Sequence, residues 1–359
     1  MAVYWCLFLY FAAGALLEQA NSAAVIARRE QALPVYAGPT KIMLRFGLLV
    51  TALLIGFRYK VGADWRPYEE IFHSTRFQSF ADVPAIGDPG YYFLNIAVQW
   101  LGADLWLVNL VCGAIATLGI CRFAEAQQRP WLTVLVAVPY LIIVVAMGYT
   151  RQAVSIGFIL MGMASYIRTG SILRVASYIV LAALFHRTAV IVLPFIAVGN
   201  ERAQFVRVLI AAVATYLLYY LFLSNSLDRY ISNYIDYRYA AEGAGVRIAM
   251  AFVPAVLLFI GRARLGLSQV EWRIWRNLGL VALILPALLV VIPSTAALDR
   301  IALYIIPLQL AVLSRPKSVF PNEGFGTLLV ILYCGAVQFT WLNYAHHARF
   351  WVPYHLWHF

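Results

Sequence analysis

Ionisable side chains interrupt the apolar stretches of this chain at positions where they can do chemistry. The sharpest case is His186 with Arg187, inside the otherwise apolar stretch of residues 171–198. Ionisable groups at membrane depth are costly and mark functional sites. Because histidine can accept a proton at neutral pH, His186 is the first candidate for a general base. A structural histidine that caps a helix break would leave the same pattern.

A second concentration of polar and aromatic residues spans positions 56–68. Asp64 could hold the backbone or Arg58 in place. Flat rings suit the faces of sugars, and the segment supplies three of them. These are Tyr59, Trp65 and Tyr68. An aromatic belt with basic residues at the membrane surface is the alternative interpretation.

Further arginines stand at the start of apolar stretches rather than at their ends. They are Arg151, which Gln152 follows, Arg247, and Arg300, which lies between Asp299 and Tyr304. The planar guanidinium donates bidentately and keeps its charge, so it is suited to a pyrophosphate. An outward-pointing helix N-terminus adds partial positive charge at the same place. Single arginines that reach the lipid surface, or an Asp–Arg pair within one helix, would also explain the pattern.

Two loops complete the polar inventory. Residues 88–92 (Asp-Pro-Gly-Tyr-Tyr) open an amphipathic stretch that ends near Leu101. Asn95 and Gln99 fall on one helical face of this stretch, which indicates an interfacial or re-entrant helix. A plain Pro-Gly turn that leads into a helix is the alternative interpretation. Residues 228–247 are rich in Tyr, Arg and Asp and are either a lid over a substrate groove or a solvated loop.

Composition shows which elements must position these groups. The chain has 359 residues, of which 63% are hydrophobic and 12% charged, which excludes a soluble fold. We predict a single all-α transmembrane domain over residues 1–359. The net charge of +11 resides in short loops and therefore indicates membrane topology and anionic lipid, not nucleic acid. The four cysteines lack ligand-like spacing, so no metal site is expected.

About 10–12 transmembrane helices are expected, with a broken or re-entrant segment near residues 171–198. The predicted spans are 3–20, 40–57, 104–121, 131–147, 149–167, 205–223, 248–261, 277–293, 298–313 and 325–343. If residues 171–198 cross as two segments, more than half of the 27 Lys and Arg residues fall on one side. That choice also puts the polar groups described above together on the other side, with outward-facing loops.

Seven blocks of residues, in this order, resemble the EpsG family of exopolysaccharide proteins, which is related to the Wzy-type O-antigen polymerases. The blocks are Phe57-Arg58-Tyr59 through Val61-Gly62 and Asp64-Trp65 to Tyr68; Pro89-Gly90-Tyr91 to Leu94-Asn95; Arg151-Gln152; Phe185-His186 to Thr188-Ala189; Gly245 to Arg247; Asp299-Arg300 to Tyr304; and Val352-Pro353-Tyr354. The resemblance extends over nearly the whole chain.

This resemblance implies a GT-C-like glycosyltransferase in the bacterial cytoplasmic (inner) membrane, with its site facing the periplasm or exterior. It implies transfer of a glycan from undecaprenyl pyrophosphate onto another lipid-linked repeat unit, with inversion and without metal or cofactor. No D-x-D motif is present, which fits this expectation. His186 or Asp64 would be the base. Arg58, Arg151, Arg187, Arg247 and Arg300 would bind the substrate with Gln152, Asp299 and the aromatic residues. Membrane lipids, a chain-length regulator and a flippase are the expected partners.

Two other functions remain open on the sequence. A membrane acyltransferase that modifies glycans would place His186 on the side where acyl-CoA arrives. A transporter or flippase of lipid-linked oligosaccharide would carry paired broken helices and ionisable residues near the membrane midplane.

Overall fold

The computed structural model describes residues 1–28, 39–79, 81, 83, 87–194, 212, 216, 243–291, 295–318 and 320–358. Within these ranges the chain is helical, and its β contact is one isolated antiparallel bridge between Arg58 and Leu356. The predicted span 205–223 and most of the predicted lid, residues 228–242, lie outside the described residues.

Four of the described helices are long and apolar enough to cross a membrane. They are residues Ala2–Ala20 of α1 (Ala2–Arg28), α6 (Leu105–Ala124), α14 (Gln269–Val291) and α17 (Glu323–Tyr344). Shorter apolar helices cover Pro130–Ala146, Ile172–Phe185 and Ala244–Ile260. The prediction of an all-α polytopic membrane protein is therefore confirmed, while the count of 10–12 spans stays a prediction.

Most predicted spans begin and end close to the helices in the structure. These helices are α2 (Pro39–Gly56), α7 (Pro130–Ala137) with its π-helical continuation η2 (Val138–Ala146), α8 (Thr150–Thr169) and α13 (Ala244–Ile260). Local signals set the ends: a proline stands in the first turn of α7, and Gly170 closes α8 in the left-handed conformation.

Two spans differ from the prediction. The predicted span 298–313 is two helices, α15 (Thr295–Tyr304) and α16 (Ile306–Leu313), because Pro307 has no N–H to continue the helical hydrogen bonds. The helix α14 begins eight residues before the predicted start at 277. Its first turn is held by reciprocal hydrogen bonds between Ser268 and Glu271, which form a capping box.

The interruption predicted in residues 171–198 is present. Helix α9 covers Ile172–Phe185, His186 has extended backbone angles (φ −155°, ψ 108°), and the 3₁₀ helix η3 covers Arg187–Val192. The alternative prediction, a single continuous helix through this stretch, is therefore wrong. The break releases the backbone N–H groups that follow His186 from helical hydrogen bonds.

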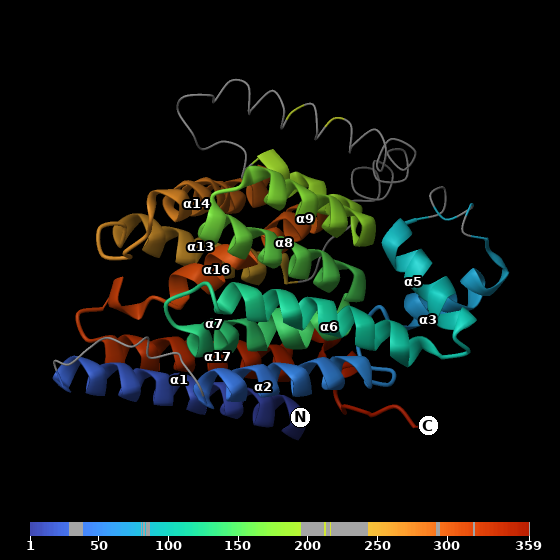
Figure 1. Ribbon diagram of the computed structural model, residues 1–359, viewed down its shortest axis with the longest axis horizontal. Coiled ribbons are helices and arrows are strands. Elements are labelled where there is room, and N and C mark those ends of the chain that lie inside the picture. The colour runs from blue at the N-terminus through green and yellow to red at the C-terminus, as the bar shows by residue number, and fades with distance from the viewer. Residues whose placement is uncertain are drawn as a thin grey trace.

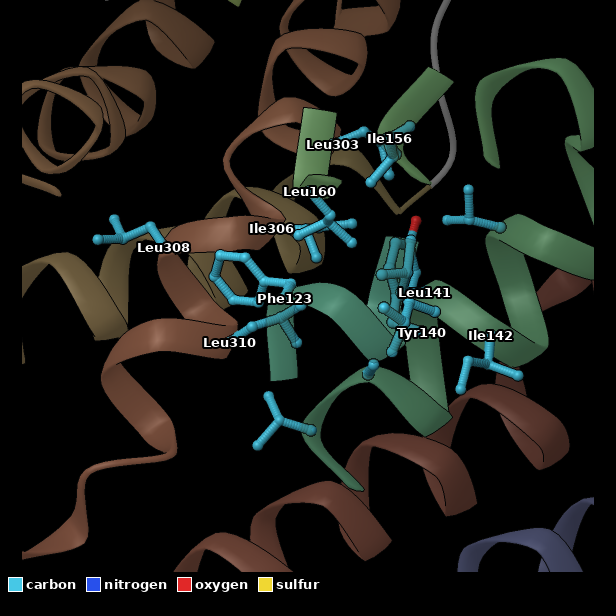
Figure 2. Close-up of a cluster of buried hydrophobic side chains, with 14 of the residues drawn as sticks. Phe123, Tyr140, Leu141, Ile142, Ile156, Leu160, Leu303, Ile306, Leu308 and Leu310 are labelled. Carbon is cyan, nitrogen blue, oxygen red and sulfur yellow. The ribbon is translucent and has the colours of Figure 1, made fainter. Parts of the chain in front are cut away.

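The helices form a bundle around α7 and η2. Every residue of Pro130–Ala146 is buried, and Figure 2 shows Tyr140, Leu141 and Ile142 of η2 among leucine and isoleucine side chains from α8, α15 and α16. Helices α1, α2 and α17 lie along one side, and α8, α9, α13 and α14 along the other (Figure 1). Small residues bring neighbours close: a Cβ on Gly119 of α6 would lie 2.2 Å from the carbonyl oxygen of Gly157 of α8.

Two short helices, α3 (Trp65–Ser74) and α5 (Pro89–Trp100), cover one end of the bundle, where the chain's C-terminal segment also lies (Figure 1). Helix α5 is the amphipathic helix predicted after Asp88. The amide group of Gln99 in α5 donates to the hydroxyl of Thr75 at 3.0 Å, and so joins α5 to the 3₁₀ helix η1 (Thr75–Phe77) that follows α3. We call this end of the bundle the capped end.

The connection α13–α14 lies at the opposite end, where Gly266 adjoins Gln128 between α6 and α7. Helix α13 consequently begins near the capped end, on the same side as Asp299.

Candidate active site

Asp88 is the centre of a polar cluster at the capped end. Its carboxylate accepts a hydrogen bond from Nη1 of Arg151 at 2.9 Å and lies 3.4 Å from Nε of Arg187. The backbone N–H of Arg187 donates to the same carboxylate at 3.2 Å, and Nδ1 of His186 lies 3.7 Å from it. One buried carboxylate therefore joins α5, α8 and the break between α9 and η3.

Helix starts explain why these residues meet. Asp88 directly precedes α5, Arg151 is the second residue of α8, and Arg187 is the first residue of η3. Helix N-termini carry unsatisfied N–H groups and partial positive charge, which stabilise an anion between them. Burial disfavours the charged form of Asp88, but His186, Arg151 and Arg187 outweigh it and hold the pKa of Asp88 below its usual range.

Arg151 is the most accessible cation of this cluster, with 29% of its side chain exposed. Its guanidinium lies over the rings of Tyr68 and Tyr91, at 5.7 and 6.0 Å from the ring centres. The hydroxyl of Tyr68 accepts the backbone N–H of Arg151 at 3.4 Å. Burial raises the pKa of Tyr68 to about 12, so its hydroxyl stays neutral and can donate to a ligand.

Asp64 stands just before α3, on the same side of the bundle. It is half-buried, and among the described residues its carboxylate makes no ion pair. Burial raises the pKa of Asp64 to about 6, while the charges of Arg151 and Arg300 act in the opposite direction. This carboxylate is ionised at neutral pH yet can take up a proton, which is what general-base chemistry requires.

The loop that carries Asp64 has a fixed shape. Gly62 has a φ of +109°, and a Cβ at this position would lie 2.3 Å from the carbonyl oxygen of Met147. The N–H of Gly62 donates to the carbonyl of Phe350, and that of Tyr59 to the carbonyl of His355. The C-terminal segment thus holds the loop against the start of α8.

Arg58 lies in a different place from the one expected. Its side chain is 1% exposed and donates to the side-chain oxygens of Asn109 and Thr150, at 3.0 and 2.7 Å. It also donates to the carbonyls of Ile55 and Val61. These contacts tie the end of α2 to α6 and α8, and they leave the guanidinium out of reach of a bulky substrate.

A second ion pair lies deeper in the bundle. Arg247 of α13 pairs with Asp299 of α15, and its Nη1 donates to the hydroxyl of Tyr140 of η2 at 3.1 Å. Next to it, the hydroxyls of Thr188 and Tyr304 are 2.9 Å apart and join η3 to α15. The charge of Arg300 acts on Asp64, His186 and Asp299, so Arg300 is within electrostatic reach of both groups.

The aromatic residues of the segment 56–68 form a group with a partner from the far end of the sequence. The ring centres of Tyr59 and Trp65 are 5.8 Å apart, and Trp357 lies 5.2 Å from Tyr59 and 6.1 Å from Trp65. Trp357 was missed by sequence reasoning, since nothing local links it to this segment.

The predicted residues His186, Arg187, Arg151 and Tyr68 therefore share one cluster, and Asp64 and Arg300 lie within electrostatic reach of it. Gln152 is buried near the start of α8, although no described partner accepts its amide Nε2. The most consequential residue missed was Asp88. Its signal was present in the Asp-Pro-Gly sequence, which equally fits a turn. Among the described residues no group of three or more His, Cys, Asp and Glu side chains is placed to hold a metal ion.

Fold and cluster together define a polytopic helical membrane protein with a cationic, carboxylate-containing site at one end of its bundle. Residues 41–356 match the family model of the EpsG family, so the chain belongs to that family, whose members have an exopolysaccharide polymerase-type function. No curated protein and no solved structure gives a match.

Proposed function

We propose that this protein polymerises a polysaccharide by transferring a glycan from undecaprenyl pyrophosphate onto the terminal sugar of another lipid-linked repeat unit. The transfer inverts the anomeric carbon and uses no metal. We place it in the bacterial cytoplasmic membrane with the capped end outward, where a flippase would supply repeat units and a chain-length regulator would act. The observation that carries the proposal is the half-buried Asp64 carboxylate beside the arginine cluster around Asp88.

The arginines act on the leaving group. When the bond between the anomeric carbon and the pyrophosphate oxygen breaks, the electron pair and the negative charge move onto the pyrophosphate. Arg151 and Arg187, already oriented by Asp88, and Arg300 are the cations closest to this charge. Donors that are positioned before the reaction lower the barrier most, because they need no reorganisation as charge develops. The N-terminus of α8 adds partial positive charge at the same place.

Asp64 is the base that the geometry favours. His186 was the first candidate, but it lies between Asp88 and cationic neighbours, and burial and the charges of Arg151 and Arg300 oppose its protonation. The carboxylate of Asp64, in contrast, makes no ion pair among the described residues and is left to accept a proton. In the proposed step its carboxylate takes the proton of the acceptor hydroxyl while that oxygen bonds to the anomeric carbon. His186 then orients Asp88, and with it the two arginines.

The remaining predicted residues take supporting roles in this proposal. The path of the sugars is lined by the aromatic residues Tyr59, Trp65, Tyr68 and Tyr304. Trp357, which packs against Tyr59 and Trp65, belongs to the same lining. Gln152 supplies an amide to a sugar hydroxyl. Arg58 positions the Asp64 loop from inside the bundle.

A transporter of lipid-linked oligosaccharide is the second candidate, and a particular observation favours it. Broken helices in pairs are typical of transporters, and here the break at His186 is joined to the break at Ile305 through the hydrogen bond between Thr188 and Tyr304. The two functions differ in their product, since a transporter moves the substrate without making a glycosidic bond.

The test uses purified protein in nanodiscs with a defined undecaprenyl-pyrophosphate repeat unit as donor and acceptor. Wild-type protein should produce a ladder of longer lipid-linked chains in the presence of a chelator, and Asp64→Asn and Arg151→Gln should not. Exposed Arg66, next to the site in sequence, gives a matched control, and Arg66→Gln should keep the ladder. Transfer of a labelled repeat unit across proteoliposomes without any ladder would overturn the polymerase and favour the transporter.

A further inference from the structure

Helix α5 at the capped end has an apolar exposed side that the proposed reaction does not use. Phe93, Ala97 and Trp100 are exposed and follow one another at intervals of four and three residues, so they lie along one side of the helix. Trp100 is 74% exposed, and Leu101, directly after the helix, is 76% exposed. The sequence of Pro89–Trp100 contains no charged residue, so the exposed side of α5 carries no charge.

The opposite side of α5 belongs to the candidate site. Asp88 directly precedes the helix, and Tyr91 and Asn95 are buried. The first turn also packs closely on α9, since a Cβ on Gly90 would lie 2.9 Å from the ring of Phe185. The helix is thus fixed to the site along one side, while the other side is open to whatever surrounds the bundle.

The neighbouring helix α3 differs from α5 in the chemistry of its exposed side. That side carries Arg66, Glu70 and His73, which recur at helical spacing and suit contact with water. Both helices are short and lie at the same end of the bundle (Figure 1). Because α3 exposes polar groups and α5 exposes apolar ones, the two helices face different surroundings.

The course of the chain puts the last turn of α5 at the membrane surface. The N–H of Ala103 donates to the carbonyl of Val98 at 3.2 Å, so this turn lies one residue from Asp104, the cap of α6. Helix α6 has 20 residues and is therefore about 30 Å long, which matches the hydrocarbon core of a bilayer. Trp100 and Leu101 consequently lie at headgroup depth, where tryptophan is enriched in membrane proteins.

We propose that the exposed side of α5, formed by Phe93, Ala97, Trp100 and Leu101, binds phospholipid of the leaflet at the capped end. The helix lies in the membrane surface with this side among the upper parts of the acyl chains. Covering a tryptophan and a leucine with lipid removes apolar area from water, which is favourable. The direct connection to α6, a helix able to span the membrane, is the reason for choosing lipid over a protein partner.

One consequence of this lipid contact rests on the proposed function. Asp88 stands at the first turn of α5 and orients Arg151 and Arg187, so the depth of the helix determines the depth of these cations. The pyrophosphate of a polyprenyl donor lies at headgroup depth. Lipid contact along α5 therefore holds the arginines at the level of the leaving group.

The lipid contact is tested by photo-crosslinking in nanodiscs of phosphatidylethanolamine and phosphatidylglycerol, with p-benzoylphenylalanine in place of Trp100. Illumination should raise the intact mass of the protein by that of one phospholipid. The same amino acid in place of Ala114, on the exposed side of α6, is the positive control. In place of His73, on the polar side of α3, it should give no lipid adduct.

Three outcomes would overturn the lipid contact. The first is a lipid adduct at position 114 with none at position 100. The second is an equal yield of lipid adduct at positions 100 and 73. The third is a crosslink at position 100 to a second copy of the chain, which would make this side of α5 a contact between protein molecules.

Chain growth tests the consequence separately. Ala97→Glu puts a carboxylate on the apolar side of α5 and should lower kcat about tenfold, because a small displacement of the helix misplaces the arginines. Ala97→Leu keeps this side apolar and should keep kcat. Equal kcat values for the two folded variants would overturn the role of lipid in placing the arginines. A lipid adduct at position 100 in a protein that makes no chains would support the lipid contact and refute the polymerase.

Discussion

The guanidinium of Arg151 lies 2.9 Å from the carboxylate of Asp88, and this contact joins the start of α8 to the start of α5 across 63 residues of sequence. Because Arg187 and His186 meet the same carboxylate, Asp88 determines how several site residues are oriented. The predictions that follow depend on this arrangement.

Asp88→Asn should both destabilise the protein and abolish chain growth. Removing the charge leaves the partly buried Arg151 and Arg187 beside a neutral amide. The cost is smaller than the roughly 3–5 kcal/mol of breaking a fully buried ion pair, because solvent reaches Arg151. Thermal unfolding in detergent measures the first effect, and the ladder assay, normalised to folded protein, measures the second. An Asp88→Asn variant with wild-type activity would exclude Asp88 as the organising residue.

Stability should depend on pH through the same residue. The pKa of Asp88 is lower in the folded protein than in the unfolded chain, so its contribution is present above its ordinary pKa and is lost as pH falls through the folded value. The melting temperature of wild type should therefore drop more steeply below about pH 4 than that of Asp88→Asn. Parallel curves for both proteins would contradict this.

Chain growth should decline in mild acid. Because the base must be ionised and the pKa of Asp64 is about 6, kcat/KM should fall about tenfold per pH unit below pH 6. Asp64→Glu should keep measurable activity with a shifted profile, whereas Asp64→Asn should be inactive at every pH. If Asp64→Asn retained the acidic limb, another group, with His186 first, would be the base.

Arg151→Lys should reduce kcat by roughly 100-fold although the charge is retained. Lysine cannot contact Asp88 and a pyrophosphate oxygen with one planar fork, and removal of a positioned donor to a developing anion has effects of this size. Exposed Lys60 offers a comparison, since Lys60→Arg should leave kcat unchanged. Steady-state kinetics with the lipid-linked donor would distinguish the two.

Gly62→Ala should inactivate the protein, whereas Gly170→Ala should not. Both glycines have positive φ, at +109° and +66°. A Cβ at Gly62 would collide with the backbone of Met147, whereas a Cβ at Gly170 would have no other atom within 4 Å. The first change displaces the Asp64 loop. The second adds about 1 kcal/mol of backbone strain at the end of α8. Similar losses of activity in both variants would refute the role of the loop.

The sequence was informative where a residue is unusual in its own surroundings. The break at His186 and the arginine in the first turn of α8 were predictable, because ionisable residues inside apolar stretches stand out without tertiary information. The break between α15 and α16 could also have been predicted from Pro307. The prediction of one span over residues 298–313 used hydropathy alone and therefore missed it.

Other parts of the site depend on contacts between distant segments. Asp88 precedes a Pro-Gly pair that fits an ordinary turn, and only folding shows that it meets α8 and α9. An arginine at a helix end such as Arg58 can point outward to phosphate or inward to Asn109, and local sequence does not distinguish the two. Trp357 meets Tyr59 and Trp65 across almost the full length of the chain.

The attachment of the C-terminal segment has a consequence for biosynthesis. The backbone of residues 350–357 bonds to Phe57, Tyr59 and Gly62, while the indole N–H of Trp351 donates to the carbonyl of Ile143. These partners leave the ribosome long before residue 350 does. The loop that carries Asp64 therefore cannot make these hydrogen bonds until residues 350–357 have been synthesised.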